Sequence, residues 1–320
     1  MSRLIRLVLI ISVVAVGDLG HAALSAADLR LEKNDRGVSV TIGDQLFTEY
    51  LINTGPKPIL WPVNGPDNKP LTRAYPMQRG KGERYDHPHH RSLWFTHGNV
   101  NDVDFWGEGK NHGSILHRAF LRLEGGPTAV IATRNDWLDV KGVKVCEDER
   151  TLTFQADDDR RTIDFEITIK AGDHPVKFGD TKEGSFGIRV AGTMKVDQRG
   201  GKPGGKIINA EGKTNRGAWG KRSPWVDYHG PVDGKTYGIA IMNHPSSFRF
   251  PTYWHVRTYG LFAANPFGLH NFLNSPKEDG SYTIKPGESI TLRYRVLLHR
   301  GDEEQGQVAE AFKAYQAEAK

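Results

Sequence analysis

Residues 161–170 read RTIDFEITIK, and this stretch decides the fold class. Apolar residues occupy every second position from Ile163 to Ile169, and polar residues occupy the positions between them. Because successive side chains of a strand point to opposite faces, this period of two predicts a β-strand with one buried side and one solvent-facing side. The same alternation occurs in residues 38–42 and in SITLRYRVLLHR, residues 289–300.

Further strand-like runs are separated by clusters of turn-forming residues. TLTFQA (151–156) and YGIAIM (237–242) have the composition of short strands, and 36 glycines suit a chain rich in turns. Neither a strand–helix alternation nor a repeat of fixed period is present, which argues against α/β barrels and propellers. We therefore predict an all-β fold, a large antiparallel β-sandwich with long loops. The expected turns are Asn34-Asp35, Gly125-Gly126-Pro127, Asp157-Asp158-Asp159, Asp233-Gly234 and Lys285-Pro286-Gly287.

One helix is expected, at the C-terminal end of the chain. Val308, Ala311, Phe312 and Tyr315 follow one another at helical spacing. The acids of residues 302–304 precede them and offer an N-cap and first-turn carboxylates, which suit the positive end of a helix dipole. The sequence thus predicts a C-terminal helix that begins at these acids and buries one apolar stripe.

The first 27 residues have the features of a secretory signal peptide. Arg3 and Arg6 precede an apolar run, Leu7–Val16, and small residues lead up to Ala27. The run is too short to span a bilayer, which takes about 20 residues. We expect cleavage at about Ala27, one domain over residues 28–320, and a periplasmic or secreted protein, with an uncleaved N-terminal anchor as the alternative. Sequencing the N-terminus of exported protein tests this expectation.

Composition excludes several classes of protein. Cys146 is the only cysteine, so neither an internal disulfide nor a zinc site built on several cysteines can form. Its acidic neighbours would raise the pKa of the thiol, which favours a structural or incidental role. A net charge of +5 without a stripe of Lys and Arg gives no indication of nucleic-acid binding. No other apolar run approaches spanning length, so no membrane partner is expected after cleavage. The oligomeric state stays open.

The strongest indication of a functional site is YDHPHHRSLWFTHGNVNDVDFW, residues 85–106. Four histidines, three aspartates, an arginine and two tryptophans lie in this segment. Imidazole can act as a general base, a hydrogen-bond donor or a metal ligand, and its pKa lies near neutrality. Pro88 disfavours helix at His87, so His87, His89 and His90 are expected to point in different directions from an ordered turn.

Two further segments, AWGKRSPWVDYHG (218–230) and NHPSSFRFPTYWHVRTYGLFAANPFG (243–268), mix charged and aromatic residues in the same way. We expect the three segments to share a pocket for a polyhydroxylated or anionic ligand, because long loops commonly carry function. Glu183 is a further carboxylate, with no distinguishing context. The candidate catalytic residues are His90, His97, Asp104 and His255, with Asp86 and Asp102 as other partners for the histidines. The candidate substrate-binding residues are His87, His89, Arg91, Trp106, Lys221, Arg222, Trp225, His244, Arg257 and Asn265.

Structural roles are the alternative for these residues. The histidines can form a buried polar network that holds the loop. Trp94, Phe95, Phe105 and Trp106 can be core residues rather than a face on which sugar C–H groups stack. No cofactor is expected. Binding of a divalent metal stays open, because imidazoles with a carboxylate would suit Zn, Fe or Mn. The HPHH spacing, however, differs from the i, i+4 spacing of a helical HExxH site.

The segment DHPHHRSLWFTHGNVNDVDFW (86–106) closely resembles the hallmark segment of the bacterial PmoA-like proteins, a DUF6807-type family of unknown function. The resemblance extends through residues 220–230 and 243–268 to LRYRVLLHRG (292–301) and so covers nearly all of the chain after the signal peptide. Ser92 and Asn99 stand where members usually have glycine and often an acidic residue, and neither change removes a candidate reactive group. The layout is also similar to the galactose-mutarotase-type supersandwich, which implies histidines and carboxylates on a concave sheet face.

These observations leave three hypotheses of function. The first is an exported carbohydrate-active enzyme, a hydrolase, lyase or epimerase that acts on a sugar or modified glycoside by acid–base chemistry of histidine and carboxylate. The second is a non-catalytic sugar-binding protein, which would need the aromatic and arginine residues but no acid–base pair. The third is a metal-dependent oxygenase, which the label of the resembling family implies. The expected partner is a small molecule or an oligosaccharide.

Overall fold

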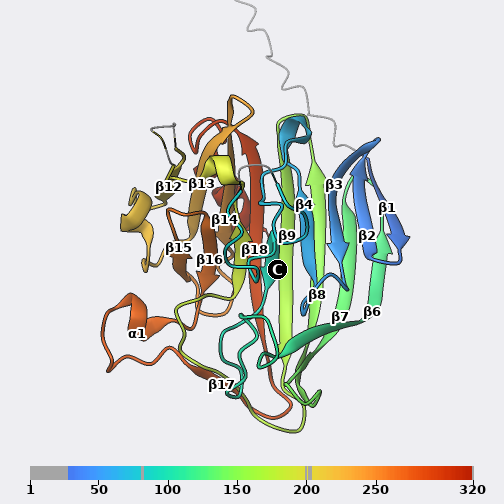
Figure 1. The fold of residues 1–320 in the computed structure, drawn as a ribbon, viewed down its shortest axis with the longest axis vertical. Helices are drawn as coiled ribbons and strands as arrows, with labels where there is room; N and C mark the ends of the chain where they lie inside the picture. The colour runs from blue at the N-terminus through green and yellow to red at the C-terminus, as the bar shows by residue number, and fades with distance from the viewer. Residues whose placement is uncertain (1–27, 81–82, 199, 201–203, 319–320) are drawn as a thin grey trace, which may run out of the picture.

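Two eight-stranded antiparallel sheets pack face to face and form the body of the protein (Figure 1). The computed structural model describes residues 28–80, 83–198, 200 and 204–318. The expected signal peptide, residues 1–27, lies outside the described residues. In Figure 1 the first sheet runs from β1 (Leu29–Asn34) at the right to β15 (Tyr253–Val256) at the left. The second runs from β6 (Ser114–Glu124) at the right to β12 (Lys206–Asn209) at the left. The predicted all-β antiparallel sandwich is confirmed.

The first sheet has the strand order β1-β2-β3-β4-β5-β11-β16-β15. Its central part joins segments that are far apart in the sequence, because β5 pairs with β11 and β11 pairs with β16. The sheet thereby brings residues near position 94 beside residues near positions 187 and 263. Its strands are β1 Leu29–Asn34, β2 Gly37–Ile42, β3 Gln45–Leu51, β4 Ile59–Val63, β5 Leu93–Phe95, β11 Phe186–Arg189, β15 Tyr253–Val256 and β16 Leu261–Asn265.

The second sheet has the order β12-β13-β14-β18-β9-β8-β7-β6, and β10 and β17 form a separate two-stranded ribbon. Within the described residues, no helix is long and apolar enough to cross a membrane. The strands are β6 Ser114–Glu124, β7 Ala129–Leu138, β8 Lys144–Ala156, β9 Arg160–Lys170, β10 Val176–Phe178, β12 Lys206–Asn209, β13 Trp225–Val232, β14 Lys235–Asn243, β17 Tyr282–Ile284 and β18 Ser289–Arg300. The helices are α1 Leu269–Phe272 and α2 Val308–Ala317, with 3-10 turns η1 Pro66–Asn68, η2 Gly192–Met194 and η3 Asn215–Ala218.

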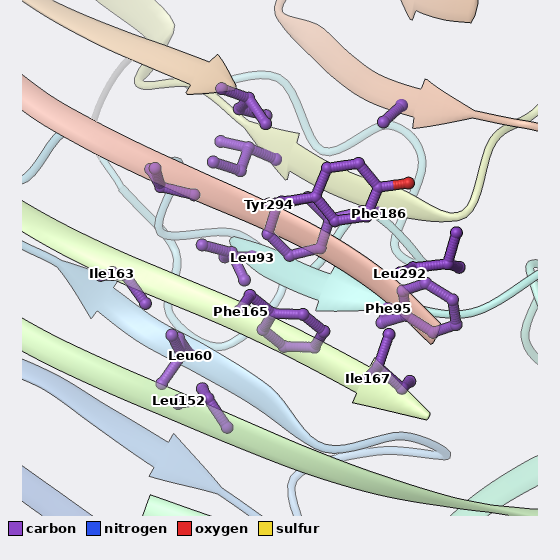
Figure 2. Close-up of a cluster of buried hydrophobic side chains, with 14 of the residues drawn as sticks. Leu60, Leu93, Phe95, Leu152, Ile163, Phe165, Ile167, Phe186, Leu292 and Tyr294 are labelled. Carbon is purple, nitrogen blue, oxygen red and sulfur yellow. The ribbon is translucent and has the colours of Figure 1, made fainter. Parts of the chain in front are cut away.

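The main core lies between the two sheets (Figure 2). Phe186 of the first sheet stacks on Tyr294 of the second, with ring centroids 4.8 Å apart, and also contacts Phe165 at 4.7 Å. The alternation in residues 161–170 therefore has the predicted consequence, since Ile163, Phe165 and their apolar neighbours in β9 face this core. Burial of such side chains contributes about 1.5–3 kcal/mol each relative to exposure.

The local predictions of strands and turns are confirmed. Residues 289–300 form β18 along their whole length, and each expected turn lies between two strands that pair or follow in sequence. Cys146 is buried in the core, and burial raises the pKa of its thiol well above the ordinary value. Phe95 and Phe105 belong to this core, whereas Trp94 and Trp106 form part of a separate apolar cluster.

The start of the C-terminal helix differs from the prediction. Helix α2 begins at Val308, after Gln307, whose backbone is in the left-handed region with φ of 50° and makes no side-chain cap bond. The upstream acids have other roles: Asp302 accepts the N–H of Gln305 at 3.0 Å, and Glu303 pairs with Lys206 at 2.8 Å. The predicted apolar stripe is correct, because Val308, Phe312 and Tyr315 are buried. The four-residue helix α1 was not predicted and is too short to show a helical period.

The outer face of the first sheet carries a row of side chains that prepares the site. Cross-strand register places Ile59, Trp94, Gly187, Ala263 and His255 side by side on β4, β5, β11, β16 and β15. Their sequence neighbours point the other way, into the main core. A Cβ at Gly187 would lie 2.8 Å from the ring of Trp94, so glycine lets the indole lie across the strand.

Candidate functional site

A pocket of about 470 Å³ lies on this outer face. It combines the loop before β5, the loop after β5, a short segment before β11 and the β15–β16 hairpin. The pocket contains four imidazoles, two carboxylates and one lysine beside two aromatic rings. Its lining residues are His87, His89, His90, Gly98, Asp104, Trp106, Gly107, Lys182, Glu183, His255, Tyr259 and Leu261.

The HPHH sequence forms a tight turn that stacks two of its histidines. The N–H of His90 donates to the carbonyl of His87 at 3.0 Å, and His87 has a left-handed backbone with φ of 48°. The two rings lie parallel, with centroids 4.8 Å apart. Tyr259 stacks on the other side of His87 at 5.5 Å, and Trp94 stacks beneath His90 at 5.5 Å. Four rings thus form one stack that stands on the sheet, and we call it the ring stack.

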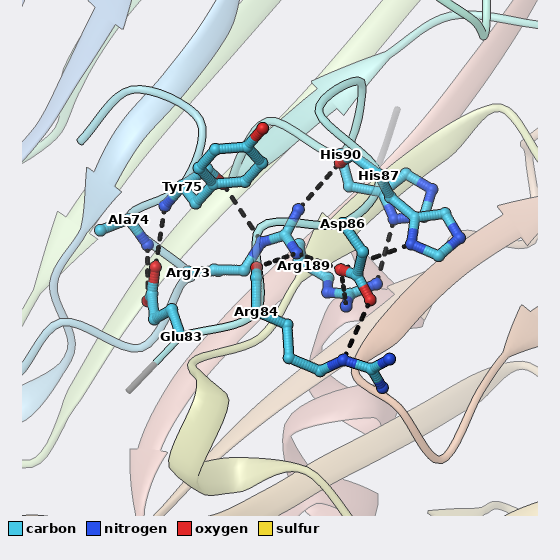
Figure 3. Close-up of polar contacts among 9 residues, drawn as sticks. All are labelled: Arg73, Ala74, Tyr75, Glu83, Arg84, Asp86, His87, His90 and Arg189. Carbon is cyan, nitrogen blue, oxygen red and sulfur yellow. Dashed lines mark hydrogen bonds and ion pairs between the residues drawn. The ribbon is translucent and has the colours of Figure 1, made fainter. Parts of the chain in front are cut away.

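A network of two buried arginines and the partly exposed Asp86 holds the ring stack (Figure 3). Arg73 donates to the Asp86 carboxylate at 2.8 Å, and Arg189 donates to it at 3.2 Å. Each of these two arginine residues is 2% exposed. Arg73 also donates to the carbonyl of His87 at 2.9 Å. Burial alone would raise the pKa of Asp86, but Arg189, His87 and Arg73 together hold it below its ordinary value. Asp86 is therefore a structural anion under the site.

Arg189 also fixes the proton of His90. Its guanidinium donates to Nδ1 of His90 at 3.1 Å. Because a guanidinium only donates, Nδ1 must carry the lone pair and the proton of the neutral ring must be on Nε2. Burial, followed by the charges of His89 and Arg189, lowers the pKa of His90 far below its ordinary value. His90 is thus a neutral imidazole of one tautomer at every physiological pH.

His89 and His255 are the pocket imidazoles with unused nitrogens. No hydrogen bond to either ring nitrogen of His89 is found among the described residues, and Nδ1 of His255 is buried without a hydrogen-bond partner there. Burial, then the charge of Lys57, lowers the pKa of His89 to about 4. Burial, then the charge of Arg257, lowers the pKa of His255 to about 3. Both rings are neutral near pH 7 and can accept a hydrogen bond from a ligand hydroxyl.

Asp104 supplies an oriented carboxylate in the lining of the same pocket. Its Oδ1 accepts the backbone N–H groups of Trp106 at 2.7 Å and Gly107 at 3.0 Å. Its Oδ2 lies 3.4 Å from Nε2 of His112, and the side chain is 44% exposed. One oxygen is therefore anchored by the backbone, and the other lies beside the partly exposed ring of His112. Glu183 is a second lining carboxylate, 3.8 Å from the ammonium of Lys182.

Three predicted residues support the pocket without lining it. Arg91 forms a two-point ion pair with Glu108, with both N–O distances 2.8 Å, and Glu108 also binds the buried Lys57. This pairing anchors the loop directly after Gly107. Asn265, fully buried at the end of β16, donates to the carbonyl of Thr181 at 2.6 Å and so holds the segment that carries Lys182 and Glu183. His97 is the third supporting residue.

His97 lies beneath the pocket rather than in its lining. It is fully buried between Phe178 and Phe267, with ring centroids 5.3 Å and 5.0 Å away. Its Nε2 is 2.8 Å from the carbonyl of Gly179, so this nitrogen must donate, and its Nδ1 is 3.2 Å from the hydroxyl of Ser185. Both ring nitrogens are therefore engaged by the protein, and neither is available to a ligand in the pocket.

Replacing His97 by alanine is expected to destabilise the fold by about 3 kcal/mol, because it opens a cavity and leaves the Gly179 carbonyl without a donor. Turnover per folded molecule at low temperature is expected to stay near the wild-type value. Urea unfolding and initial rates measure the two effects, with the exposed His174→Ala as the matched control. A stable His97→Ala protein without turnover would restore the catalytic assignment.

The segment 218–230 does not reach this pocket. Lys221 is exposed, and Arg222 donates to the carbonyls of Pro251 at 2.8 Å and Phe250 at 3.1 Å. Trp225 packs beside helix α2, as does His244, whose ring lies 4.9 Å from that of Tyr315. Arg257 lies in a neighbouring pocket that shares Tyr259 with this one. The structure thus joins the first and third predicted segments in this pocket, whereas the second segment reaches only the neighbouring pocket, through Trp219.

Tyr259, Lys182 and Arg189 are site residues that the sequence argument missed. Tyr259 had a detectable indication, because His255, Arg257 and Tyr259 alternate and therefore share one face of a hairpin. Arg189 and Lys182 had none, since their relation to residues 86–106 depends on the pairing of β5 with β11. A motif in one segment does not reveal which distant strand lies beside it.

Potential metal ligands cluster elsewhere. Among the described residues, the group whose donor atoms lie within 4.8 Å of one another is Asp227, His229 and Glu303. Asp227 already pairs with His299 at 2.8 Å and Glu303 with Lys206 at 2.8 Å, so protein cations balance both carboxylates. This group lies outside the pocket lining, and its imidazole and carboxylate donors are of the types that the divalent metal left open by the sequence would use. Elemental analysis of purified protein tests the oxygenase hypothesis directly.

Neutral buried imidazoles predict a stability that falls in acid. Burial lowers the pKa of His97 to about 4 and that of His255 to about 3, from an ordinary value of 6.5. Between about pH 4 and pH 6.5 the unfolded chain binds protons that the folded protein does not, so the free energy of unfolding decreases as the pH falls through this window. His299 behaves in the opposite way. Burial alone would lower its pKa, but the ion pair with Asp227 raises it, and this pair therefore opposes the loss of stability in acid.

Urea unfolding across this window measures the slope, and His255→Gln isolates one titrating group. The variant is expected to show a shallower loss in acid, by up to about 1.4 kcal/mol per pH unit. An unchanged slope in His255→Gln would contradict the neutral state of this ring in the folded protein.

The fold and the pocket define an all-β sandwich protein with a histidine-lined pocket on one sheet. The chain belongs to a family of unknown function, DUF6807, whose model matches residues 37–313. A search of curated proteins gave no match.

Several solved structures share a distant likeness to the chain. The α-galactosidase AgaA from Geobacillus stearothermophilus is 11% identical with a TM-score of 0.38, and the match covers 86% of this chain and 40% of the α-galactosidase. The Slr1438 protein from Synechocystis sp. PCC 6803 is 11% identical with a TM-score of 0.35, covering 87% and 96% of the two chains. A galactose mutarotase related enzyme from Lactobacillus acidophilus is 11% identical with a TM-score of 0.30, covering 88% and 97%. The chain thus spans less than half the length of the α-galactosidase.

Proposed function

We propose that the protein is a carbohydrate-active enzyme that moves protons on a bound sugar with a carboxylate and neutral imidazoles. One observation carries the proposal: the oriented carboxylate of Asp104 and the unpaired ring of His89 line one pocket beside Trp106 and Tyr259. Aromatic faces suit the C–H surface of a sugar, and convergent polar groups suit its hydroxyls. The charge of Asp104 raises the pKa of His89 against burial, so the two groups interact electrostatically.

Asp104 is the proposed general base, because Oδ1 is held by two backbone donors while Oδ2, 3.4 Å from Nε2 of His112, accepts no hydrogen bond among the described residues. His89 is the proposed partner: a neutral imidazole donates from one nitrogen and accepts at the other, so it can pass a proton between substrate atoms. His255 accepts a substrate hydroxyl at Nδ1. His90 is a positioning residue whose tautomer Arg189 fixes.

Two reaction types are compatible with these groups. A carboxylate base with neutral imidazole donors suits proton removal next to a carbonyl, as in lyases and epimerases. Two carboxylates in the lining of one pocket, Asp104 and Glu183, suit hydrolysis of a glycosidic bond. Reactions in D₂O and in ¹⁸O-labelled water separate them. An epimerase places solvent deuterium on carbon, a lyase leaves a carbon–carbon double bond in its product, and only a hydrolase places labelled oxygen in the product sugar.

A non-catalytic sugar-binding protein is the second candidate, and the lowered pKa values of His89 and His255 favour it, since such rings hydrogen-bond well and are weak bases. NMR of a panel of mono- and oligosaccharides, including uronic and oxidised sugars, distinguishes the two. Conversion of any member supports the enzyme. Binding without conversion of a bound member supports the second candidate, and neither binding nor conversion contradicts both.

We further propose that the protein acts after export and removal of residues 1–27. The proposal is supported by the composition of that segment, and the N-terminal sequence of the exported protein tests it.

A further inference from the structure

A second pocket of about 410 Å³ adjoins the first. The tip of the β15–β16 hairpin separates them, and Tyr259 lines both. The ring of Trp219 lies 6.2 Å from that of His255, edge to face, so the aromatic wall is continuous from one pocket to the other. The second pocket is lined by Asp197, Arg216, Trp219, Val256, Arg257, Thr258 and Tyr259.

Hydrogen-bond donors dominate this second pocket. The guanidinium of Arg257 lies 5.9 Å from the ring of Trp219 and 5.7 Å from that of Tyr259, an arrangement that orients it without neutralising it. Within the described part of the chain, neither Arg257 nor Arg216 has a carboxylate within ion-pair distance. The indole Nε1 of Trp219 is buried without a hydrogen-bond partner there. A buried donor and two unpaired guanidiniums together favour a ligand with acceptor oxygens.

The charges of the two pockets are opposite. In the second pocket, Asp197 is the one carboxylate against two arginines, and one of its oxygens already accepts the hydroxyl of Thr258 at 2.6 Å. In the first pocket, the carboxylates of Asp104 and Glu183 outnumber the single Lys182. Arg257 also lowers the pKa of His255, so its charge is felt at the candidate reaction centre. A ligand that spans both pockets is oriented with its anionic end on the arginines.

We propose that the substrate is an acidic saccharide whose carboxylate or sulfate group binds Arg216, Arg257 and the indole N–H of Trp219, while the adjoining sugar unit lies against Asp104 and His89. This inference rests on the proposed function, because it names the substrate class of the same site. Planar guanidinium groups bind carboxylate and sulfate oxygens by charge-assisted hydrogen bonds, and such bonds are the stronger ones.

Calorimetry and turnover with matched disaccharides test the proposal. The probes are cellobiose with cellobiouronic acid, galactobiose with digalacturonic acid, and lactose with its sulfate ester, so that the uronate and sulfate arms are separate. We expect only acidic members to be bound or converted, with affinity that falls as salt rises. Arg257→Gln should weaken the acidic ligand about 10- to 100-fold through Kd or KM with little change in kcat. Arg257→Lys should recover part of this loss, and Lys277→Gln, an exposed cation outside both pockets, should change nothing.

The outcomes separate the anionic subsite from the proposed function. If neutral members are bound or converted as well as acidic ones, or if Arg257→Gln has no effect on an acidic member, the anionic subsite is wrong and the proposed function stands. If Arg257→Gln weakens neutral and acidic members equally, the residue shapes the pocket and the subsite is again wrong. If no member is bound or converted, the proposed function fails, and this inference fails with it.

Discussion

Asp104→Asn is expected to lower turnover of the identified substrate by about 10²- to 10⁴-fold, the usual cost of losing a positioned general acid or base. The fold should be preserved, because the asparagine Oδ1 can still accept the N–H groups of Trp106 and Gly107 that the aspartate accepts at 2.7 and 3.0 Å. Only the negative charge and the basicity of the outer oxygen are lost. Initial rates and a melting temperature on the same preparation measure the two effects.

Asp102→Asn is the matched control for this experiment. Asp102 lies two residues away, is exposed, and is outside the pocket lining, so the same chemical change there should leave turnover within about twofold. If the loss of one negative charge merely changed the long-range electrostatic attraction of the substrate, Asp104→Asn and Asp102→Asn would be affected alike. Equal rates in wild type and Asp104→Asn would remove Asp104 from the mechanism and leave Glu183 as the remaining carboxylate of the pocket.

The strands were predictable because their information is local. The alternation in residues 161–170 and 289–300 needs no knowledge of the partner strand, and each run indeed forms one strand with one face in the core. The start of α2 was not predictable in this way. The acids at residues 302–304 have the composition of a helix start, but Glu303 pairs with Lys206 on β12, a contact that only the packed fold provides.

The candidate site divides along the same line. The density of histidine and aspartate in residues 85–106 located the pocket, since His87, His89, His90, Asp104 and Trp106 all line it. The chemical state of each histidine could not be predicted. Gly179 and Ser185, more than eighty positions downstream, engage both nitrogens of His97. By contrast, no hydrogen bond to a ring nitrogen of His89 is found in the described part of the chain. Sequence spacing indicates which residues are near one another, and long-range register decides which of them are available to a ligand.

Below the site, replacing Asp148 by alanine is expected to lower the free energy of unfolding by about 3–5 kcal/mol, the range found when one partner of a buried ion pair is removed. Asp148 is fully buried on β8 and binds Arg150 through both carboxylate oxygens, each at 2.8 Å. It also accepts from Asn135 at 2.8 Å and from the indole of Trp137 at 2.6 Å. Alanine would leave the guanidinium of Arg150, 1% exposed, with no counter-charge in the core.

The loss of stability should also affect the pocket, because Arg150 lies over the ring of Phe95 at 5.9 Å and Phe95 is the neighbour of Trp94 in the three-residue strand β5.

Urea unfolding measures the stability, and the exposed Asp158→Ala serves as control, with an expected change within about 0.5 kcal/mol. The double variant Asp148→Leu with Arg150→Met should recover most of the loss, since it removes both charges and keeps apolar volume. If the double variant is as unstable as Asp148→Ala, packing of the carboxylate with Asn135 and Trp137, rather than the uncompensated guanidinium, holds this part of the core. A loss below about 1 kcal/mol in Asp148→Ala would mean that water or a neighbouring group solvates Arg150, a result at odds with its burial.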